Sequence, residues 1–172
     1  DSNPDFTIWK YQSSSAWSTG SYTSDFAGIN AYNYDPYNQF IFTTSVVTTT
    51  SFTSTFNVAK VMNLNEPISK SNSWLGTSNY AYFGGYVYAS GGASTIFVGN
   101  WAGLNNKYIG LRLIDTATTD TVYGWARISV DPLYNDLTIH DYAYETDGST
   151  IPAGRTSSGG GGNPSSITEK SS

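Results

Sequence analysis

Residues 108–154 read YIGLRLIDTATTDTVYGWARISVDPLYNDLTIHDYAYETDGSTIPAG and hold three strand-like runs separated by polar turns. Apolar side chains recur at every second position of these runs: Ile109, Leu111 and Leu113, then Ala126, Ile128 and Val130, then Leu137, Ile139 and Ala143. A period of two is typical of half-buried strands, because successive side chains point to opposite faces. The turns contain Asp, Asn and Pro, which favour chain reversal. The stretch therefore predicts antiparallel strands joined by hairpins.

The opposite faces of the same runs are unusually aromatic. They carry Arg112, then Tyr123, Trp125 and Arg127, then His140, Tyr142 and Tyr144. A face that only meets water does not need so many rings. We therefore expect either that a second layer covers these side chains or that a ligand binds there.

The rest of the chain extends the β pattern. Runs rich in β-branched and aromatic residues occupy 6–11, 26–34, 40–47, 53–61, 80–88 and 95–98, with Gly, Asn, Pro and Ser between them. With the three later runs this makes roughly nine strands, which predicts an all-β fold, a two-sheet antiparallel β-sandwich of jelly-roll type. We expect residues 1–154 to form this one domain. Residues 155–172, RTSSGGGGNPSSITEKSS, are predicted to be a Gly/Ser-rich tail or linker.

Composition limits the classes of partner. The chain has 172 residues, a formal net charge of −5 and only 8 Lys and Arg, so we expect no nucleic-acid partner, which would need clustered cations. It has no Cys, which excludes disulfides and thiolate metal sites. No run approaches the ~20 apolar residues that span a bilayer, so no membrane span is expected. A start at Asp1 with no leader-like segment indicates a processed, secreted product.

Four motifs resemble the C-terminal pattern of one group of exported proteins. They are YIGLRL at 108–113, YGWARISV at 123–130, LTIHDYAYET at 137–146 and IPAG at 151–154. They are similar to the YxGxRF, HYGWxRxxV, IxDYAYET and IxAG motifs of exported bacterial β-sandwich proteins of the Bacteroidetes and PEP-CTERM type. The matching positions are Tyr108, Gly110, Arg112, Tyr123, Gly124, Trp125, Arg127, Asp141, Tyr142, Tyr144, Glu145 and Gly154. The resemblance implies export to the bacterial cell surface and a β-sandwich, and it brings no catalytic residues with it.

This chain departs from that pattern at two points. Val122 stands where the group usually has a His before the YGW motif, and no hydrophobic sorting segment follows Gly154. The second departure predicts a form whose anchor has been removed or never existed.

The first residues offer a candidate calcium site. Asp1, Asn3 and Asp5 place oxygen ligands at alternate positions, the spacing by which calcium-binding loops direct side chains toward one hard cation. The segment lacks the Gly and the later Glu of such loops, and Pro4 is unusual there. The alternative is a chain start capped by its own Asp and Asn side chains. No other cofactor is expected.

Two short triplets are candidates for O-glycosylation. Thr116 and Thr121 each follow an Asp and precede an apolar residue, which resembles the short sites that Bacteroidetes glycosylate. Triplets of this kind also arise by chance.

Nothing in the sequence predicts catalysis. His140 and Asp141 are adjacent on one strand and point to opposite faces, so they do not form a base and its orienting carboxylate. Glu66, Asp141 and Glu145 have hydrophobic neighbours, as glycosidase carboxylates do. Asp141 and Glu145 are separated by about 13 Å of strand, which exceeds the spacing of either glycosidase class. We therefore expect a non-enzymatic protein.

Two non-enzymatic functions remain open. In the first, the chain is a secreted structural or adhesive protein of the cell surface, which self-associates into a filament or matrix, or binds other envelope proteins, through strand edges and the tail. In the second, it is a carbohydrate-binding module. Its candidate stacking platforms are Trp74, Tyr80, Tyr82, Tyr86, Tyr88 and Trp101. The four tyrosines would line one strand face, or else pack between the sheets. Trp9, Trp17 and Trp125 are expected to be core or half-buried anchors.

Overall fold

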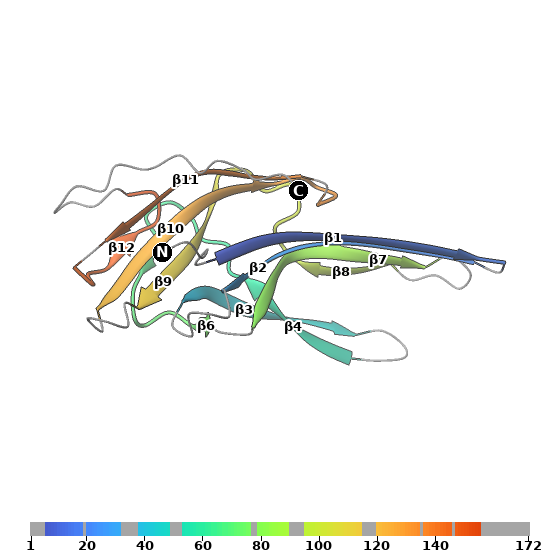
Figure 1. Cartoon of the computed structure of the whole chain (residues 1–172), viewed down its shortest axis with the longest axis horizontal. Helices are drawn as coiled ribbons and strands as arrows, with labels where there is room; N and C mark the ends of the chain where they lie inside the picture. Colours follow the sequence, from blue (N-terminus) through green and yellow to red (C-terminus); the bar gives the residue numbers. More distant parts are fainter. Residues whose placement is uncertain are drawn as a thin grey trace.

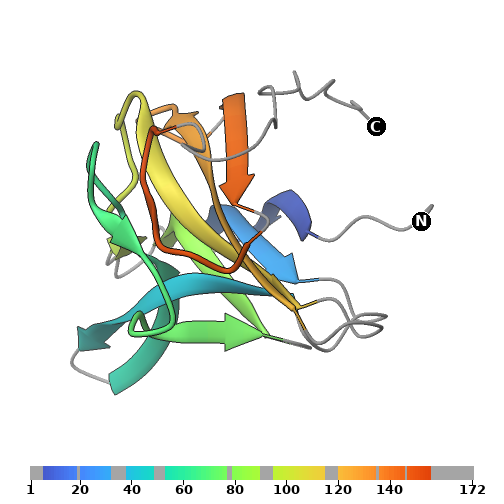
Figure 2. The same ribbon diagram turned by 90° about the vertical axis from the view of Figure 1, so that its left-hand side faces the viewer.

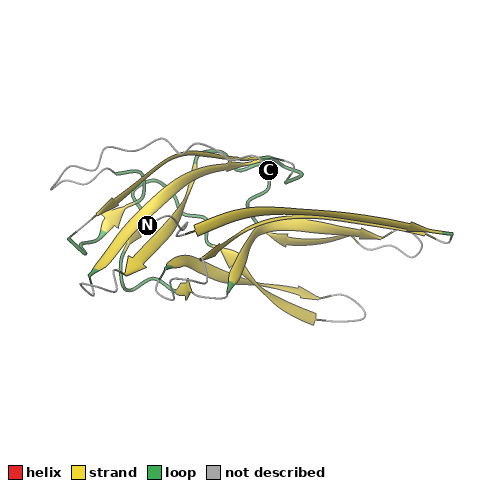
Figure 3. Ribbon diagram, in the orientation of Figure 1, coloured by secondary structure: helices red, strands yellow, loops and turns green. Residues whose placement is uncertain are grey.

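The computed structural model of this chain describes residues 6–18, 20–31, 38–48, 53–76, 79–89, 95–114, 120–134, 136–145 and 147–155. All regular structure in these residues is β-strand (Figure 3). The prediction of an all-β, sandwich-like fold is confirmed. Within the same residues there is no helix with the length and apolar character needed to cross a membrane.

The described residues form twelve strands. They are β1 (Phe6–Trp17), β2 (Gly20–Ala31), β3 (Gln39–Thr48), β4 (Thr53–Ala59), β5 (Pro67–Ile68), β6 (Trp74–Gly76), β7 (Tyr80–Ala89), β8 (Thr95–Gly99), β9 (Lys107–Ile114), β10 (Thr121–Val130), β11 (Leu137–Glu145) and β12 (Ile151–Pro152). Nine of them correspond to the predicted runs. The other three, β5, β6 and β12, are two or three residues long, too short to show any periodicity.

Ten strands belong to one large curled sheet, and β5 and β12 form a small second sheet. The main path of the large sheet is β1-β2-β7-β4-β3-β9-β10-β11, with β8 beside β7 and β6 beside β3. Contrary to the prediction, the pairing is not wholly antiparallel, because β4 runs parallel to β7 at Val58 and Tyr82. Figure 1 shows β1, β2, β7 and β8 continuing beyond the rest of the molecule as one extended layer, which we call the long arm.

Strand β3 joins the two halves of the large sheet. Its first residues, Gln39 and Phe40, pair with β9, and its remainder, from Phe42 to Thr48, pairs with β4. The sheet curls at this strand, so β9, β10 and β11 lie over one face of β2 and β7 (Figures 1 and 2). The result is a sandwich made from a single continuous sheet.

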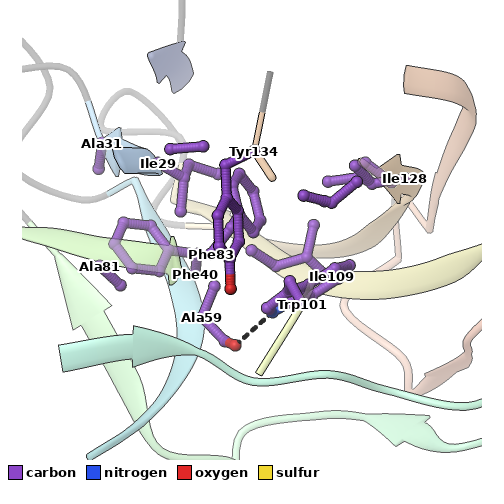
Figure 4. Packing of buried hydrophobic residues seen from close by; sticks show 13 residues of the cluster. Ile29, Ala31, Phe40, Ala59, Ala81, Phe83, Trp101, Ile109, Ile128 and Tyr134 are labelled. Carbon is purple, nitrogen blue, oxygen red and sulfur yellow. Dashed lines mark hydrogen bonds between the residues drawn. The ribbon is translucent and has the colours of Figure 1, made fainter. Parts of the chain in front are cut away.

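The inner core fills the space between the two halves (Figure 4). Its buried members are Ala27, Ile29, Ala31, Phe40, Ala59, Ala81, Phe83, Trp101, Ile109, Ala126, Ile128, Val130 and Tyr134. Ile29 and Phe83 come from the first half, and Ile128 comes from the second. Burial of these apolar side chains provides the main favourable contribution to folding.

A second core covers the other face of β9, β10 and β11. It contains Ile41, Met62, Ile68, Tyr108, Tyr123, Trp125, Ala143, Ile151 and Ala153. Ile68 and Ile151 come from the small sheet, where they lie opposite each other. A second layer therefore covers Tyr123 and Trp125. This was one of the two alternatives that the sequence left open for the aromatic face of these strands, the other being a bound ligand.

A β-bulge in β11 explains one wrong prediction. Arg127 pairs with Asp141 and Ile128 pairs with Ile139, so His140 is an extra residue. An extra residue reverses which face the later side chains occupy. Leu137 therefore packs against the inner core, whereas Ala143 lies in the second core. The expectation that Leu137, Ile139 and Ala143 share one face is wrong.

Candidate functional site

A second bulge, in β7, divides the predicted row of tyrosines. Ala27 pairs with Gly84 and Gly28 pairs with Tyr82, so Phe83 is the extra residue. Tyr80 and Tyr82 consequently lie on the face of the sheet that points away from the inner core. Tyr86 lies on the opposite face and packs against the inner core. The prediction that Tyr86 lines the same face as Tyr80 and Tyr82 is wrong, and the side chain of Tyr88 lies outside the described residues.

Aromatic side chains from four neighbouring strands meet on the face that carries Tyr80 and Tyr82. They are Trp9 and Tyr11 of β1, Phe26 of β2, Phe56 of β4, and the two tyrosines of β7. Tyr82 is central, with ring centroids 5.7 Å from Trp9, 5.3 Å from Phe26, 5.9 Å from Phe56 and 5.3 Å from Tyr80. We call these six residues the aromatic face.

Two glycines allow these rings to lie across the sheet. Gly28 is directly opposite Trp9, and Gly85 is directly opposite Phe26. A methyl group at Gly28 would come within 2.4 Å of Cζ2 of Trp9, and one at Gly85 within 2.1 Å of Cδ1 of Phe26. Each ring therefore occupies the space above a neighbouring backbone that has no side chain. This is how Trp9 reaches Tyr82 two strands away.

A pocket of about 620 Å³ opens on the aromatic face. It is lined by Trp9, Tyr11, Phe26, Asn30, Ala31, Asn79, Tyr80 and Tyr82. The volume lies within the range of about 300–1,000 Å³ that is typical of small-ligand sites. Tyr11 and Tyr80 are 54% and 51% exposed, so the rim presents aromatic surface to solvent. Two amides, Asn30 and Asn79, are the polar side chains of the lining besides the tyrosine hydroxyls.

The described lining of the pocket is uncharged: among the residues that the structure describes, it contains no Asp, Glu, Lys, Arg or His. Burial and a hydrogen bond with Tyr80 raise the pKa of Tyr82 above its ordinary value, so this phenol stays protonated at physiological pH. The Nδ2 atom of Asn79 donates to the carbonyl oxygen of Gly76 at 2.9 Å, which orients this amide at the rim.

The two tryptophans predicted to be stacking platforms, Trp74 and Trp101, pack against the cores instead. Trp101 is fully buried, its Nε1 donates to the carbonyl oxygen of Ala59 at 2.7 Å, and its ring packs edge-on against Phe83 (Figure 4). It cannot stack on a sugar, so that prediction is wrong. The ring of Trp74 packs against Tyr123 and lies under the guanidinium of Arg112, 4.9 Å from its centroid. Trp74 thus covers the second core.

Tyr86 has a different partner from the other tyrosines. Its hydroxyl donates to Oδ2 of Asp25 at 2.6 Å, and this hydrogen bond, with partial desolvation, raises the pKa of Tyr86. Asp25 is only 3% exposed, and its other oxygen, Oδ1, has no hydrogen-bond partner in the part of the chain that the structure describes. The pair lies on the inner face of the long arm.

Several predicted residues lie outside the described part of the chain or apart from the pocket. Asp1, Asn3, Asp5, Thr116 and the tail beyond Arg155 are outside it, so calcium binding and the role of the tail stay predictions. Thr121 is described, as the first residue of β10. In the described ranges, no three His, Cys, Asp or Glu side chains lie close enough together to hold a metal ion.

The side chains considered for catalysis have other partners. The expectation that His140 and Asp141 point to opposite faces is wrong, because the bulge turns both toward the face of β10 that carries Arg127 and Ser129. Asp141 pairs with Arg127 through two hydrogen bonds of 2.8 and 2.7 Å. Glu66 accepts from Lys60 at 2.9 Å, and Glu145 is buried. Nε2 of the exposed His140 lies 2.7 Å from Oγ of the half-buried Ser129. The absence of enzymatic activity stays a prediction.

Sequence reasoning found Tyr80 and Tyr82 but missed most of the pocket. Trp9 was expected to be a core or half-buried anchor, while Tyr11, Phe26, Asn30 and Asn79 were not considered for binding. The available signal was the alternation of Trp9 and Tyr11 in one run and of Tyr80 and Tyr82 in another. What was missing was the strand pairing that places both runs beside β2.

Comparison with protein-family models, with curated proteins and with solved structures found no match to this chain.

Proposed function

We propose that this protein binds neutral carbohydrate in the pocket of the aromatic face. The observation that carries the proposal is the combination of exposed rings and amides, with no charged side chain among the described lining residues. Aromatic faces bind the C–H surfaces of pyranose rings, and amides hydrogen-bond to their hydroxyl groups. An acidic sugar or a phosphate would need a cation, and the described part of the lining has none.

The angles between the rings favour a single glycan chain over a flat polysaccharide surface. The planes of Trp9 and Tyr82 meet at 77°, those of Trp9 and Tyr80 at 78°, and those of Tyr80 and Tyr82 at 89°. Rings at right angles cannot form one flat platform. They suit a ligand that presents different faces to successive rings, such as a twisted oligosaccharide or the end of a chain.

The ring spacing also argues against an aromatic cage for a quaternary ammonium ion. The centroids of Trp9, Tyr80 and Tyr82 are only 5.3–6.1 Å apart, so the three rings fill the space between them. A cation must approach to about 6 Å of each centroid from a shared central space. That space is absent among these three rings.

Titration calorimetry with a panel of soluble neutral hexasaccharides tests the proposal. The panel includes β-1,4-glucan, α-1,4-glucan, xylan and mannan fragments. We expect at least one to bind, and Trp9→Ala and Tyr80→Ala each to weaken it at least tenfold, which corresponds to about 1.4 kcal/mol. The matched control is Tyr144→Ala, because Tyr144 is 44% exposed on β11, outside the pocket lining. Failure of the whole panel, or equal losses in the control, would contradict the proposal.

The location and wider role rest on the sequence. Export, a place on the bacterial cell surface and membership of the group that the C-terminal motifs resemble stay predictions. A glycan-binding surface protein would also be adhesive, so the two sequence-based functions are compatible. Fractionation of cells that make the full-length protein, with surface proteolysis as the readout, tests the location.

A further inference from the structure

Strand β1 forms one end of the large sheet, and no other described strand pairs with its long outer edge. All twelve of its residues pair with β2, from Phe6 with Ala31 to Trp17 with Gly20, without any shift of register. No other strand in the described residues pairs with β1. Its outer edge therefore presents about 40 Å of main chain, by strand rise, with an alternating row of N–H and C=O groups.

This edge has few of the features that normally block pairing. Blocking features are charges, Pro, bulges and short length. β1 contains a single charged residue, Lys10, and no Pro. Its exposed residues are Lys10, Tyr11, Gln12, Ser14, Ser15 and Ala16. The edge at the opposite end of the sheet differs, because β11 has a bulge at His140 and carries Asp141 and Glu145.

We propose that a second copy of this chain pairs with β1 through its own β1, antiparallel, about a two-fold axis perpendicular to the sheet. A two-fold contact is isologous: where residue i of one copy lies opposite residue j of the other, residue j also lies opposite residue i. The contact joins both free edges at once, so no further copy can add to them. With the axis beside Gln12, Lys10 lies opposite Ser14 and Tyr11 lies opposite Ser13. No like charges meet along this edge, and every outward backbone group of the paired stretch gains a partner.

The symmetry fixes where the two pockets lie. Rotation about an axis perpendicular to the sheet does not exchange the two faces of the sheet. The aromatic faces of both copies therefore lie on the same side of the joined sheet. Trp9 and Tyr11 belong to β1 itself, which places the two pockets next to the junction. The dimer would then bind the chains of one polysaccharide with two sites, and this consequence rests on the proposed glycan-binding function.

Single-cysteine crosslinking of the full chain tests the pairing. The chain has no Cys, so a reducible dimer can only come from an introduced residue. Residues opposite each other in an antiparallel pair have Cα atoms about 4.5–5.5 Å apart, within the range that a disulfide spans. We expect one of Gln12→Cys, Ser13→Cys and Ser14→Cys to form a disulfide dimer in dilute solution, and Thr138→Cys on the edge strand β11 to remain monomeric.

Sedimentation without glycan measures the non-covalent dimer. We expect a concentration-dependent dimer whose dissociation constant rises at least tenfold when Gln12→Lys and Ser14→Lys are combined, and is unchanged by Thr138→Lys. A monomer at all concentrations together with no β1 crosslink would overturn the proposal. So would a dimer that Thr138→Lys disrupts, or a dimer that appears only after truncation behind Arg155, since the C-terminal residues would then cover the edge.

Glycan measurements separate this inference from the proposed function. The Lys double variant should keep the affinity for a soluble hexasaccharide but lose at least tenfold in retention on the immobilised polysaccharide. Unchanged retention would overturn the two-site consequence. If no hexasaccharide binds, the proposed function fails while the sedimentation and crosslinking results still decide the dimer.

Discussion

The indole ring of Trp9 lies directly over Gly28, its partner on the neighbouring strand, and reaches Tyr82 on the strand beyond. The pocket therefore depends on a residue that contributes no side chain to it. A search for exposed aromatic residues alone would not find Gly28.

Gly28→Ala should displace the Trp9 ring, because the added methyl would lie 2.4 Å from Cζ2 of Trp9 and 2.6 Å from the carbonyl oxygen of Ala81. We expect a loss of about 1–3 kcal/mol in the free energy of unfolding, the usual effect of overpacking, together with weaker sugar binding and a changed tryptophan fluorescence spectrum. In a Trp9→Leu background the same substitution should cost less, since part of the clash is gone. Equal costs in both backgrounds would show that Trp9 and Gly28 are not coupled.

Trp101, which was predicted to be a stacking platform, and Trp9, which was predicted to be an anchor, should respond in opposite ways. Trp101→Ala should lower the free energy of unfolding by about 3–5 kcal/mol, because it removes a fully buried side chain and leaves the carbonyl oxygen of Ala59 without its donor. Trp9→Ala should cost clearly less, because Trp9 is only partly buried, yet abolish sugar binding. Denaturant titration and calorimetry on both variants test this contrast. Comparable destabilisation would place Trp9 in the core.

The pair of the buried Asp25 and the half-buried Tyr86 should be sensitive to loss of one hydroxyl. Tyr86→Phe removes the donor to Oδ2 and leaves a carboxylate that is 3% exposed. We expect a loss of about 1–3 kcal/mol. Asp25→Asn in the same background should recover part of it, because the neutral amide is less costly to bury. Tyr144→Phe is the control, and an equal effect there would contradict the role of the hydrogen bond.

Glu66 should contribute pH-dependent stability. Partial burial disfavours its charged form, but the backbone N–H of Asn63 and the ammonium of Lys60 outweigh this and lower the pKa of Glu66 below its ordinary value. A lowered pKa in the folded state means that the contribution is present above the unfolded pKa and is lost as pH falls through the folded one. Glu66→Gln should cost about 0.5–1 kcal/mol at neutral pH and nothing at low pH. Denaturant titrations across the acid range measure the difference, and a constant difference would contradict the prediction.

Periodicity predicted the strands well because each long strand has one apolar face. It failed at Phe83 and His140, where a bulge adds one residue and exchanges the faces. A bulge is set by the partner strand as much as by its own residues, so alternation along one strand cannot reveal it. The same limit explains Tyr86, which was placed with Tyr80 and Tyr82 but lies on the other face.

The pocket was harder to predict than the fold for a related reason. Trp9, Gly28 and Tyr82 are far apart in the sequence and become neighbours only through the order β1-β2-β7. The sequence around a tryptophan does not decide whether it is buried, as Trp101 is, or half-buried, as Trp9 is. The difference in burial depends on where β9, β10 and β11 lie over the rest of the sheet.

The position of β3 in both halves of the sheet has a consequence for how the chain folds. The inner core contains residues from Ala27 to Tyr134, and β3 must pair with β4 on one side and with β9 on the other to enclose it. No short segment can bury that core, so little stability is gained until most of the chain is in place. Contacts between residues so distant in sequence are slow to form. We therefore expect slow, all-or-none refolding with a single kinetic phase shared by both halves, and a nascent chain that stays unfolded until β9 and β10 have been synthesised.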